Sequence, residues 1–214
     1  MAGYQAHMAT GIGLGIASAI LLIATVSLPL FYAPLILVAI IIGSFLPDLD
    51  SDTGLPVRIL FFTLGLILSM FVGHWLFYTV EFDILRTLIL TLCSFGFIYY
   101  GLQYLFNKST KHRGIFHSLL AVVISILASN ILLITLEYEI VDAGVFSTSL
   151  GVGYLGHLIL DEMNSLVNLS GIPFIPKRSL GSALKIFSKS RRVNIIAVLI
   201  ITCLVYLNYV QIYT

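Results

Sequence analysis

Four of the five histidines of this chain, and its one run of aspartates, fall in the short stretches AHMATG, LPDLDSD, HRGIFHS and GHLILDE. Imidazole and carboxylate groups without thiolates suit Zn²⁺, Mn²⁺ or Fe²⁺. We expect zinc first, because nitrogen ligands favour it. The candidate ligands outnumber the positions around one tetrahedral ion, so two or more ions that share a carboxylate give the simplest count. These candidates are His7, Asp48, Asp50, His112, His117, His157 and Asp161.

Local spacing indicates which of these side chains act together. His157 and Asp161 are four residues apart, so on a helix they project from one face. His112 and His117 flank the expected start of a helix, with His112 in the preceding loop and His117 about one turn inside. Gly114 between them allows a close approach of the backbone.

The aspartate run has a different geometry. Asp48 and Asp50 follow Pro47, where the chain must leave helical geometry. Alternating carboxylates on such a segment reach one ion or bridge two. Taken singly, each stretch also has a structural interpretation: a surface His7, a solvated aspartate turn, a basic anchor, or a buried His–Asp pair between helices. Their occurrence together favours a site.

The elements that hold these stretches are membrane helices. The 214 residues are 59% hydrophobic and only 10% charged, against about 25% charged in a soluble domain, and the mean hydropathy is +1.05. The net charge of +1 does not predict nucleic-acid binding, which needs a basic surface. The first residues lack a basic n-region, so we expect the first apolar block to stay as a transmembrane helix rather than a cleaved signal peptide.

Apolar length predicts an all-α polytopic transmembrane bundle of about 6–7 helices, since each span needs roughly 17–25 residues. Residues 1–214 form one membrane-embedded domain, with the motifs in 7–176 and a basic segment plus a terminal helix in 177–214. The second span is the weakest, because Pro34 interrupts it, and it is read as tilted or partly re-entrant. The expected spans are 10–28, 31–46, 57–80, 84–106, 115–136, 143–163 and 193–213.

Glycine spacing predicts where helices meet. Gly11 and Gly15 form a GxxxG pair of the kind found at membrane helix contacts. A second set, Gly151, Gly153 and Gly156, would let a neighbour approach the sixth span closely. His74 lies inside the third span, away from the four stretches, and is read as a packing or interfacial residue beside Trp75. Neither a disulfide nor a CxxC site is expected from the two cysteines, Cys93 and Cys203.

Basic residues predict the orientation. Only Arg86 among the 11 lysines and arginines falls on the side opposite the N-terminus, so the positive-inside rule places the N-terminus and the motif loops in the cytoplasm. All four stretches then lie at cytoplasmic helix ends. The segment 171–192 is a juxtamembrane anchor, a collector of anionic lipid headgroups, or both. The basic residues on the cytoplasmic side are Arg58, Lys108, Lys111, Arg113, Lys177, Arg178, Lys185, Lys189, Arg191 and Arg192.

The stretches LPDLDSD, HRGIFHSLLA and GYLGHLILDEMN, the last followed by GIPFIP, together with the early His7, resemble the YdjM-like family of inner-membrane metal-dependent hydrolases over about residues 7–176. That family is distantly similar to zinc-dependent phospholipase C and the single-strand-specific nucleases, which hold several zinc ions with clustered His and Asp, including an HxxxD pair. This chain departs from the soluble relatives, which use the amino group of a processed N-terminal residue as a ligand, since its first ligand candidate is His7. The resemblance implies direct ligation by His157 and Asp161, with further ligands from His7, Asp48 or Asp50, His112 and His117.

The expected function is therefore a phospholipase C-like phosphohydrolase of the bacterial inner membrane. Its substrate would be a phospholipid, an isoprenoid phosphate or another amphiphile, met at the cytoplasmic face. Asp50 or Asp161 would bridge ions or take a proton, and Arg113 would steady negative charge on the phosphoryl group. The alternatives are a non-catalytic metal-binding transporter or sensor, and a structural protein whose polar clusters pin helices. Few mid-span polar groups are present, and none is charged, which argues against conduction.

Overall fold

The computed structural model describes residues 3–50, 54–109, 114–167, 181, 184–188 and 190–213, and in these residues the regular secondary structure is helical apart from one isolated β-bridge. The predicted all-α fold is confirmed. Among the described residues, six helical stretches are long and apolar enough to cross a membrane, and a shorter apolar helix covers Leu119–Thr135. The six are Tyr4–Val26, Tyr32–Leu49, Leu55–Tyr78, Ile84–Lys108, Ile140–Leu166 and Arg191–Tyr213.

The chain forms two compact units, Met1–Pro47 with Arg113–Thr214, and Asp48–His112. We call them unit 1 and unit 2. The helices of unit 1 are α1 (Tyr4–Val26), α2 (Tyr32–Phe45), α6 (Leu119–Thr135), α7 (Ile140–Val167) and α8 (Arg191–Tyr213). A 3-10 helix, η1 (Leu46–Asp50), follows α2 directly. Unit 2 holds α3 (Leu55–Tyr78), α4 (Ile84–Gly96), the π-helical turn η2 (Phe97–Leu102) and α5 (Gln103–Ser109).

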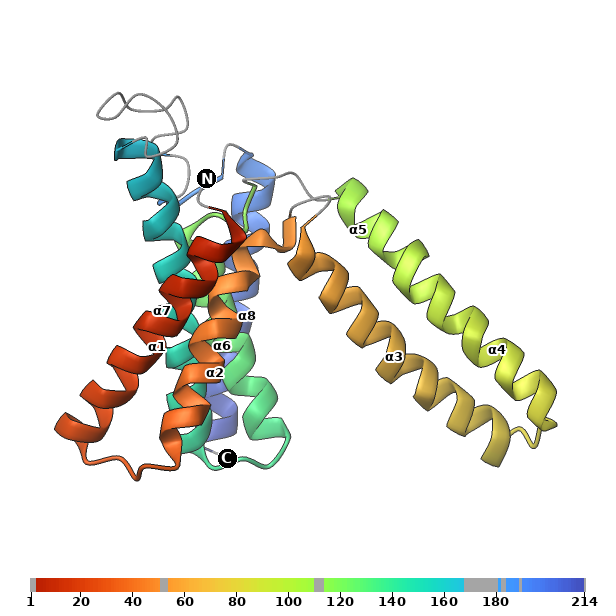
Figure 1. Ribbon diagram of the computed structural model, residues 1–214. Helices are drawn as coiled ribbons and strands as arrows, with labels where there is room; N and C mark the ends of the chain where they lie inside the picture. Colours follow the sequence, from red (N-terminus) through yellow and green to blue (C-terminus); the bar gives the residue numbers. More distant parts are fainter. Residues whose placement is uncertain are drawn as a thin grey trace. The chain divides into compact units, whose positions relative to one another are not determined.

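The centre of unit 1 is α2, which packs between α1 and α7 (Figure 1). Ile36, Ala39 and Ile40 on this helix are fully buried. The expectation that Pro34 interrupts the second span is wrong. Pro34 lies in the first turn of α2, where a helix has no use for the backbone N–H that proline lacks.

Glycines allow α2 to approach both neighbours. On α1, the buried residues His7, Gly11, Gly15 and Ala19 recur every fourth position and so share one face. A Cβ at Gly11 or Gly15 would meet Ser44 or Leu37 of α2 at 2.6 Å. On the other side of α2, a Cβ at Gly43 would strike the Leu150 carbonyl, and one at Gly153 would strike the Ile40 carbonyl. The α2–α7 contact is thus one of backbone against backbone, as the glycines of the sixth span predicted.

Polar side chains fasten α8 to the bundle. Asn208 Nδ2 donates to the Leu127 carbonyl of α6 at 3.2 Å, and its Oδ1 accepts from Asn130 Nδ2 at 2.7 Å. Ser147 of α7 donates to Asn130 Oδ1 at 3.4 Å. Buried amides in a membrane protein must find such partners, because lipid offers none. These groups therefore join α8 to α6 and α7.

Unit 2 is a pair of helices in which α3 packs against α4, η2 and α5 (Figure 1). A Cβ at Gly65 would touch the Phe95 ring at 3.2 Å, so a small residue is required there. Asp83 caps α4 by accepting from Arg86 N at 3.0 Å. His74 is exposed and its ring lies 4.7 Å from that of Tyr78, consistent with an interfacial residue. The cysteines are free, as expected.

Candidate metal centre

Two of the expected ligands come from the same face of α7. His157 and Asp161 lie one turn apart, with side-chain exposures of 1% and 0%. Tyr154 and Leu158 beside them are buried in an apolar cluster of unit 1. An imidazole and a carboxylate are thereby held in the interior near one end of the bundle, where ionisable groups are costly and are usually functional.

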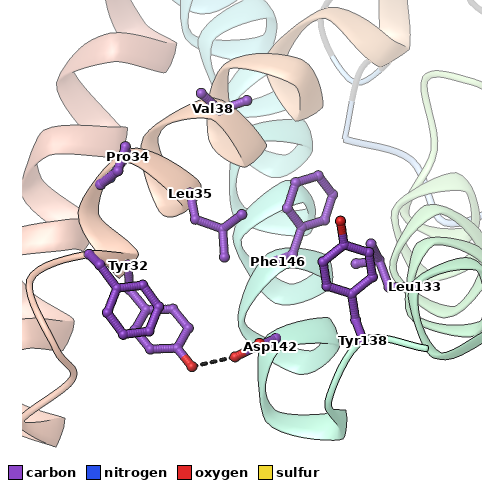
Figure 2. Close-up of a pocket in the computed structure, with 9 residues that line it drawn as sticks. Tyr32, Pro34, Leu35, Val38, Leu133, Tyr138, Asp142 and Phe146 are labelled. Carbon is purple, nitrogen blue, oxygen red and sulfur yellow. Dashed lines mark hydrogen bonds between the residues drawn. The ribbon is translucent and has the colours of Figure 1, made fainter. Parts of the chain in front are cut away.

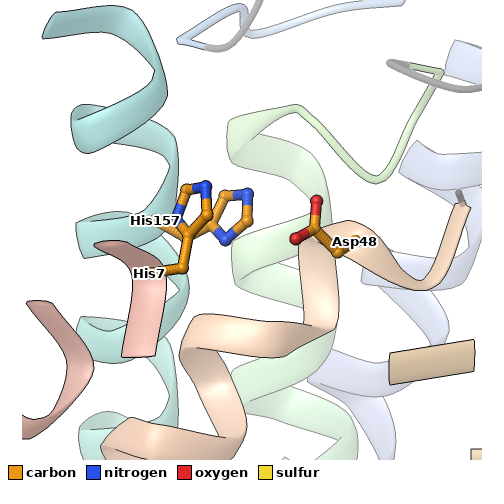
Figure 3. A group of neighbouring side chains, drawn as sticks. All are labelled: His7, Asp48 and His157. Carbon is orange, nitrogen blue, oxygen red and sulfur yellow. The ribbon is translucent and has the colours of Figure 1, made fainter. Parts of the chain in front are cut away.

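His7 reaches this pair from α1. It is 1% exposed and belongs to the glycine stripe that faces α2, so the close α1–α2 contact carries it inward. Its ring stacks on that of His157, with centroids 3.7 Å apart and an interplanar angle of 10° (Figure 3). His7 Nε2 lies 3.4 Å from Asp161 Oδ1. Its other nitrogen, Nδ1, is buried and has no hydrogen-bond partner among the described residues.

His117 completes the cluster from the segment before α6. The expectation that it lies one turn inside the helix is wrong: α6 begins at Leu119, and Ser118 is its N-cap. Ser118 Oγ bonds the Ile115 carbonyl at 2.5 Å and accepts from Ala121 N at 3.4 Å, so this residue turns the chain before the helix starts. His117 is fully buried, and its Nε2 lies 3.8 Å from Asp161 Oδ2.

The distances in this cluster fit metal ligation better than direct bonding. Hydrogen bonds join nitrogen and oxygen at about 2.7–3.2 Å, whereas Asp161 lies 3.4 Å from His7 and 3.8 Å from His117. Two ligands on one tetrahedral zinc ion, each about 2.0–2.1 Å from it, are about 3.3 Å apart. Ligand atoms of His117, His157 and Asp161 all lie within 4.8 Å of one another. The donor set and the spacing therefore suit a divalent ion.

A backbone carbonyl fixes the tautomer of His157. Its Nδ1 lies 2.7 Å from the Ser44 carbonyl, which can only accept, so Nδ1 carries the proton. In the neutral ring the lone pair is then on Nε2. Metal-bound histidines generally donate their other N–H in this way, which orients the ring. Because Ser44 lies in the last turn of α2, next to Gly43, the tight α2–α7 contact sets this bond.

The structure describes the remaining predicted site residues only in part. Asp48, which opens unit 2, is on η1, the helix that begins in unit 1 as the continuation of α2. It is half-buried, and its predicted role as a ligand remains a prediction. Asp50 ends η1, but its side chain lies outside the described part of the chain. The same holds for His112 and Arg113, whose predicted roles remain predictions.

Three positioning residues escaped the sequence reasoning. Ser44 acts through its carbonyl, so its side chain gave no signal. Tyr154 donates its hydroxyl to the Phe116 carbonyl at 2.6 Å and so holds the segment that carries His117. Its place three residues before His157 is the clue that was available. Glu162 accepts from the Gly181 and Leu184 amides, while Leu119 N donates to the Lys185 carbonyl at 2.9 Å. The segment around residues 184–185 thus lies against the His117 segment.

Comparison with known proteins gives a family and no more. A family model described as YdjM inner membrane protein matches residues 1–213. No curated protein and no solved structure matches the chain. The family description names a membrane location and no reaction. Together with the six apolar helices, it shows a multi-pass inner membrane protein.

Proposed function

The chain belongs to the YdjM inner membrane protein family, and we propose that it is a metal-dependent, phospholipase C-like hydrolase. The substrate is a phosphoester of a membrane phospholipid, an isoprenoid phosphate or a similar amphiphile. The observation that carries this proposal is the cluster of buried residues contributed by three separate parts of unit 1: His7, His117, His157 and Asp161. Imidazole and carboxylate ligands favour zinc, with manganese or iron as alternatives.

The residues of the cluster have different roles in binding an ion. Asp161 offers Oδ1 on the side of His7 and Oδ2 on the side of His117, so its carboxylate is placed to serve one ion or to bridge two. The Ser44 carbonyl holds the proton of the neutral His157 ring on Nδ1, which leaves the lone pair of Nε2 for an ion. A bound divalent ion would supply Lewis-acid activation of water and polarisation of a phosphoryl oxygen. Arg113 and Asp50 keep their proposed roles in steadying phosphoryl charge and accepting a proton.

We further propose that the metal centre faces the cytoplasm. Within unit 1, Lys185 pairs with Ser118 next to His117, and α8 starts shortly after with Arg191 and Arg192. The end of unit 1 at which α7 begins carries Glu137 and Glu139. Lysine and arginine are retained on the cytoplasmic side of inner-membrane proteins, which supports this orientation. A site at that level meets lipid headgroups without extracting a lipid.

A second candidate is a metal site without turnover. Closed structural zinc sites use four protein ligands, whereas catalytic sites keep one position open. If His7, His117, His157 and Asp161 all bind one ion, its coordination is complete, and all four are at most 1% exposed. The burial of these four side chains favours a closed metal site. Such a site would suit an ion sensor or a structural ion that holds helices together.

Turnover by reconstituted protein separates the two candidates. Wild-type chain would be loaded with zinc or manganese, placed in phospholipid vesicles with added isoprenoid phosphate, and assayed for diacylglycerol and inorganic phosphate. We expect product from wild type and from His74→Gln, whose histidine is exposed in unit 2, and loss of at least 100-fold in Asp161→Asn and His157→Gln. Metal retained at full occupancy with no product from any of these substrates would support the closed site instead.

A further inference from the structure

A second polar feature of unit 1 lies far from the metal centre. A cavity of about 550 Å³ opens at the other end of α7, between the start of α2, the end of α6 and the start of α7 (Figure 2). Asp142 on its wall precedes Asp161 on the same helix by 19 residues, or about 28 Å at the rise of an α-helix. The lining residues are Phe31, Tyr32, Pro34, Leu35, Val38, Leu133, Tyr138, Asp142 and Phe146.

The polar chemistry of this pocket is concentrated at Asp142. Tyr32 donates its hydroxyl to Asp142 Oδ1, which orients the carboxylate toward the pocket (Figure 2). The side chain is half-buried. In the described part of the chain, no lysine or arginine forms an ion pair with Asp142. The pocket therefore presents one carboxylate, held by a neutral donor, inside a wall that is apolar apart from the hydroxyls of Tyr32 and Tyr138.

Aromatic residues line much of the same pocket. Four of the lining residues are aromatic: Phe31 and Tyr32 from the α2 side, and Tyr138 and Phe146 from the α7 side. Ring faces attract ammonium groups within about 6 Å, and proteins use aromatic cages to bind quaternary ammonium ligands. The pocket thus has the composition of an ammonium site.

Charge and location agree with a lipid ligand. Glu137 and Glu139 are exposed on the chain between α6 and α7, beside the pocket, so the local charge is negative and complements a cation. Leu35, Val38 and Leu133 continue the wall along the bundle, where the membrane offers acyl chains. A free aqueous amine would leave this apolar wall without a partner.

We propose that this pocket binds a membrane lipid whose headgroup ends in an ammonium group. The ammonium lies against Asp142 and the aromatic rings, and an acyl chain covers the apolar wall. The site is independent of the metal centre and of any hydrolysis there, and it faces the opposite leaflet. Tyr32 serves as a positioning residue, since it touches the carboxylate that meets the ligand.

Competition between two lipids that differ only in the headgroup tests the proposal. The full chain would be reconstituted in nanodiscs of equal dioleoyl-phosphatidylethanolamine and dioleoyl-phosphatidylglycerol, and the lipids retained on release would be counted by native mass spectrometry. Both lipids share the phosphate and the chains; they differ in the terminal group, an ammonium against a glycerol, and in the net charge that the ammonium sets, so a preference reports that group. We expect wild type to retain phosphatidylethanolamine over phosphatidylglycerol by roughly tenfold.

Two variants of pocket residues, with one control outside the pocket, test whether the lipid preference arises in this pocket. Asp142→Asn keeps an acceptor for the Tyr32 hydroxyl but removes the charge, so we expect the preference to disappear while thermal stability changes little. Glu81→Gln removes the same charge from an exposed residue of unit 2 that does not line the pocket, and it keeps the preference. Phe146→Leu weakens the preference for phosphatidylethanolamine by removing one aromatic ring from the pocket. Equal retention of both lipids by wild type, or an unchanged preference in Asp142→Asn, would overturn the assignment.

Discussion

A single methyl group on α1 is expected to disturb the metal centre from a distance. In Gly11→Ala, the new Cβ would lie 2.6 Å from Ser44 Oγ and 3.2 Å from Ser44 Cβ. Reaching ordinary contact requires a shift of up to about 0.8 Å by Ser44 or by α1. Rotation of the hydroxyl relieves only the first contact, so the helices must also separate slightly. His7 is one turn away on the same face of α1.

Gly13→Ala is the matched control, because a Cβ at Gly13 meets nothing within 4 Å. Both replacements gain the same helix propensity, about 1 kcal/mol, and this gain cancels in the comparison. Overpacking costs about 1–3 kcal/mol, so Gly11→Ala should be less stable than Gly13→Ala by that amount. Its metal affinity should fall about tenfold, since Ser44 also orients His157.

Unfolding in mixed micelles and chelator competition measure the two effects. Each variant would be titrated with denaturing detergent for the free energy of unfolding, and with a chromophoric chelator for the dissociation constant of zinc. Equal stability and equal zinc affinity in the Gly11 and Gly13 variants would refute the reasoning that the close α1–α2 contact positions His7.

Two further contacts give predictions of their own. Tyr154→Phe removes the bond to the Phe116 carbonyl, so zinc affinity should fall about tenfold and stability by about 1 kcal/mol. Chelator competition measures the zinc affinity, and no change is expected for the control Tyr206→Phe, whose side chain is exposed. An unchanged zinc affinity in Tyr154→Phe would contradict the prediction. Asn208→Leu removes the amide that joins α8 to Asn130, and we expect about 1 kcal/mol of lost stability in a detergent unfolding titration. If Asn208→Leu is as stable as wild type, this amide does not hold α8.

The membrane class, the helix contacts and the shared helix face of His157 and Asp161 followed from local patterns. Hydropathy located the spans because lipid demands long apolar helices. The spacing of His157 and Asp161 placed them on one helix face, and the GxxxG pair marked the face of α1 that meets α2. Each of these is a property of one helix and can be read from consecutive residues.

What the sequence missed depends on contacts between distant segments. The partner of His157 is the backbone carbonyl of Ser44, and a carbonyl has no sequence signature. The helix after His117 starts later than its apolar run suggested, because Ser118 caps it. Pro34 was read as an interruption, although its effect depends on where the helix begins. The pocket proposed to bind an ammonium lipid combines Tyr32 with Asp142, which are 110 positions apart in the sequence.

Metal content tests the central claim most directly. Wild type, His117→Gln, His157→Gln and His74→Gln would be purified in mild detergent and analysed by inductively coupled plasma mass spectrometry. The buried cluster predicts at least one zinc, manganese or iron ion per chain in wild type and in His74→Gln, and its loss from the other two variants. Metal-free wild type after loading with these ions, or full occupancy in His157→Gln and His117→Gln, would contradict the metal centre and leave the cluster as polar contacts that hold helices together.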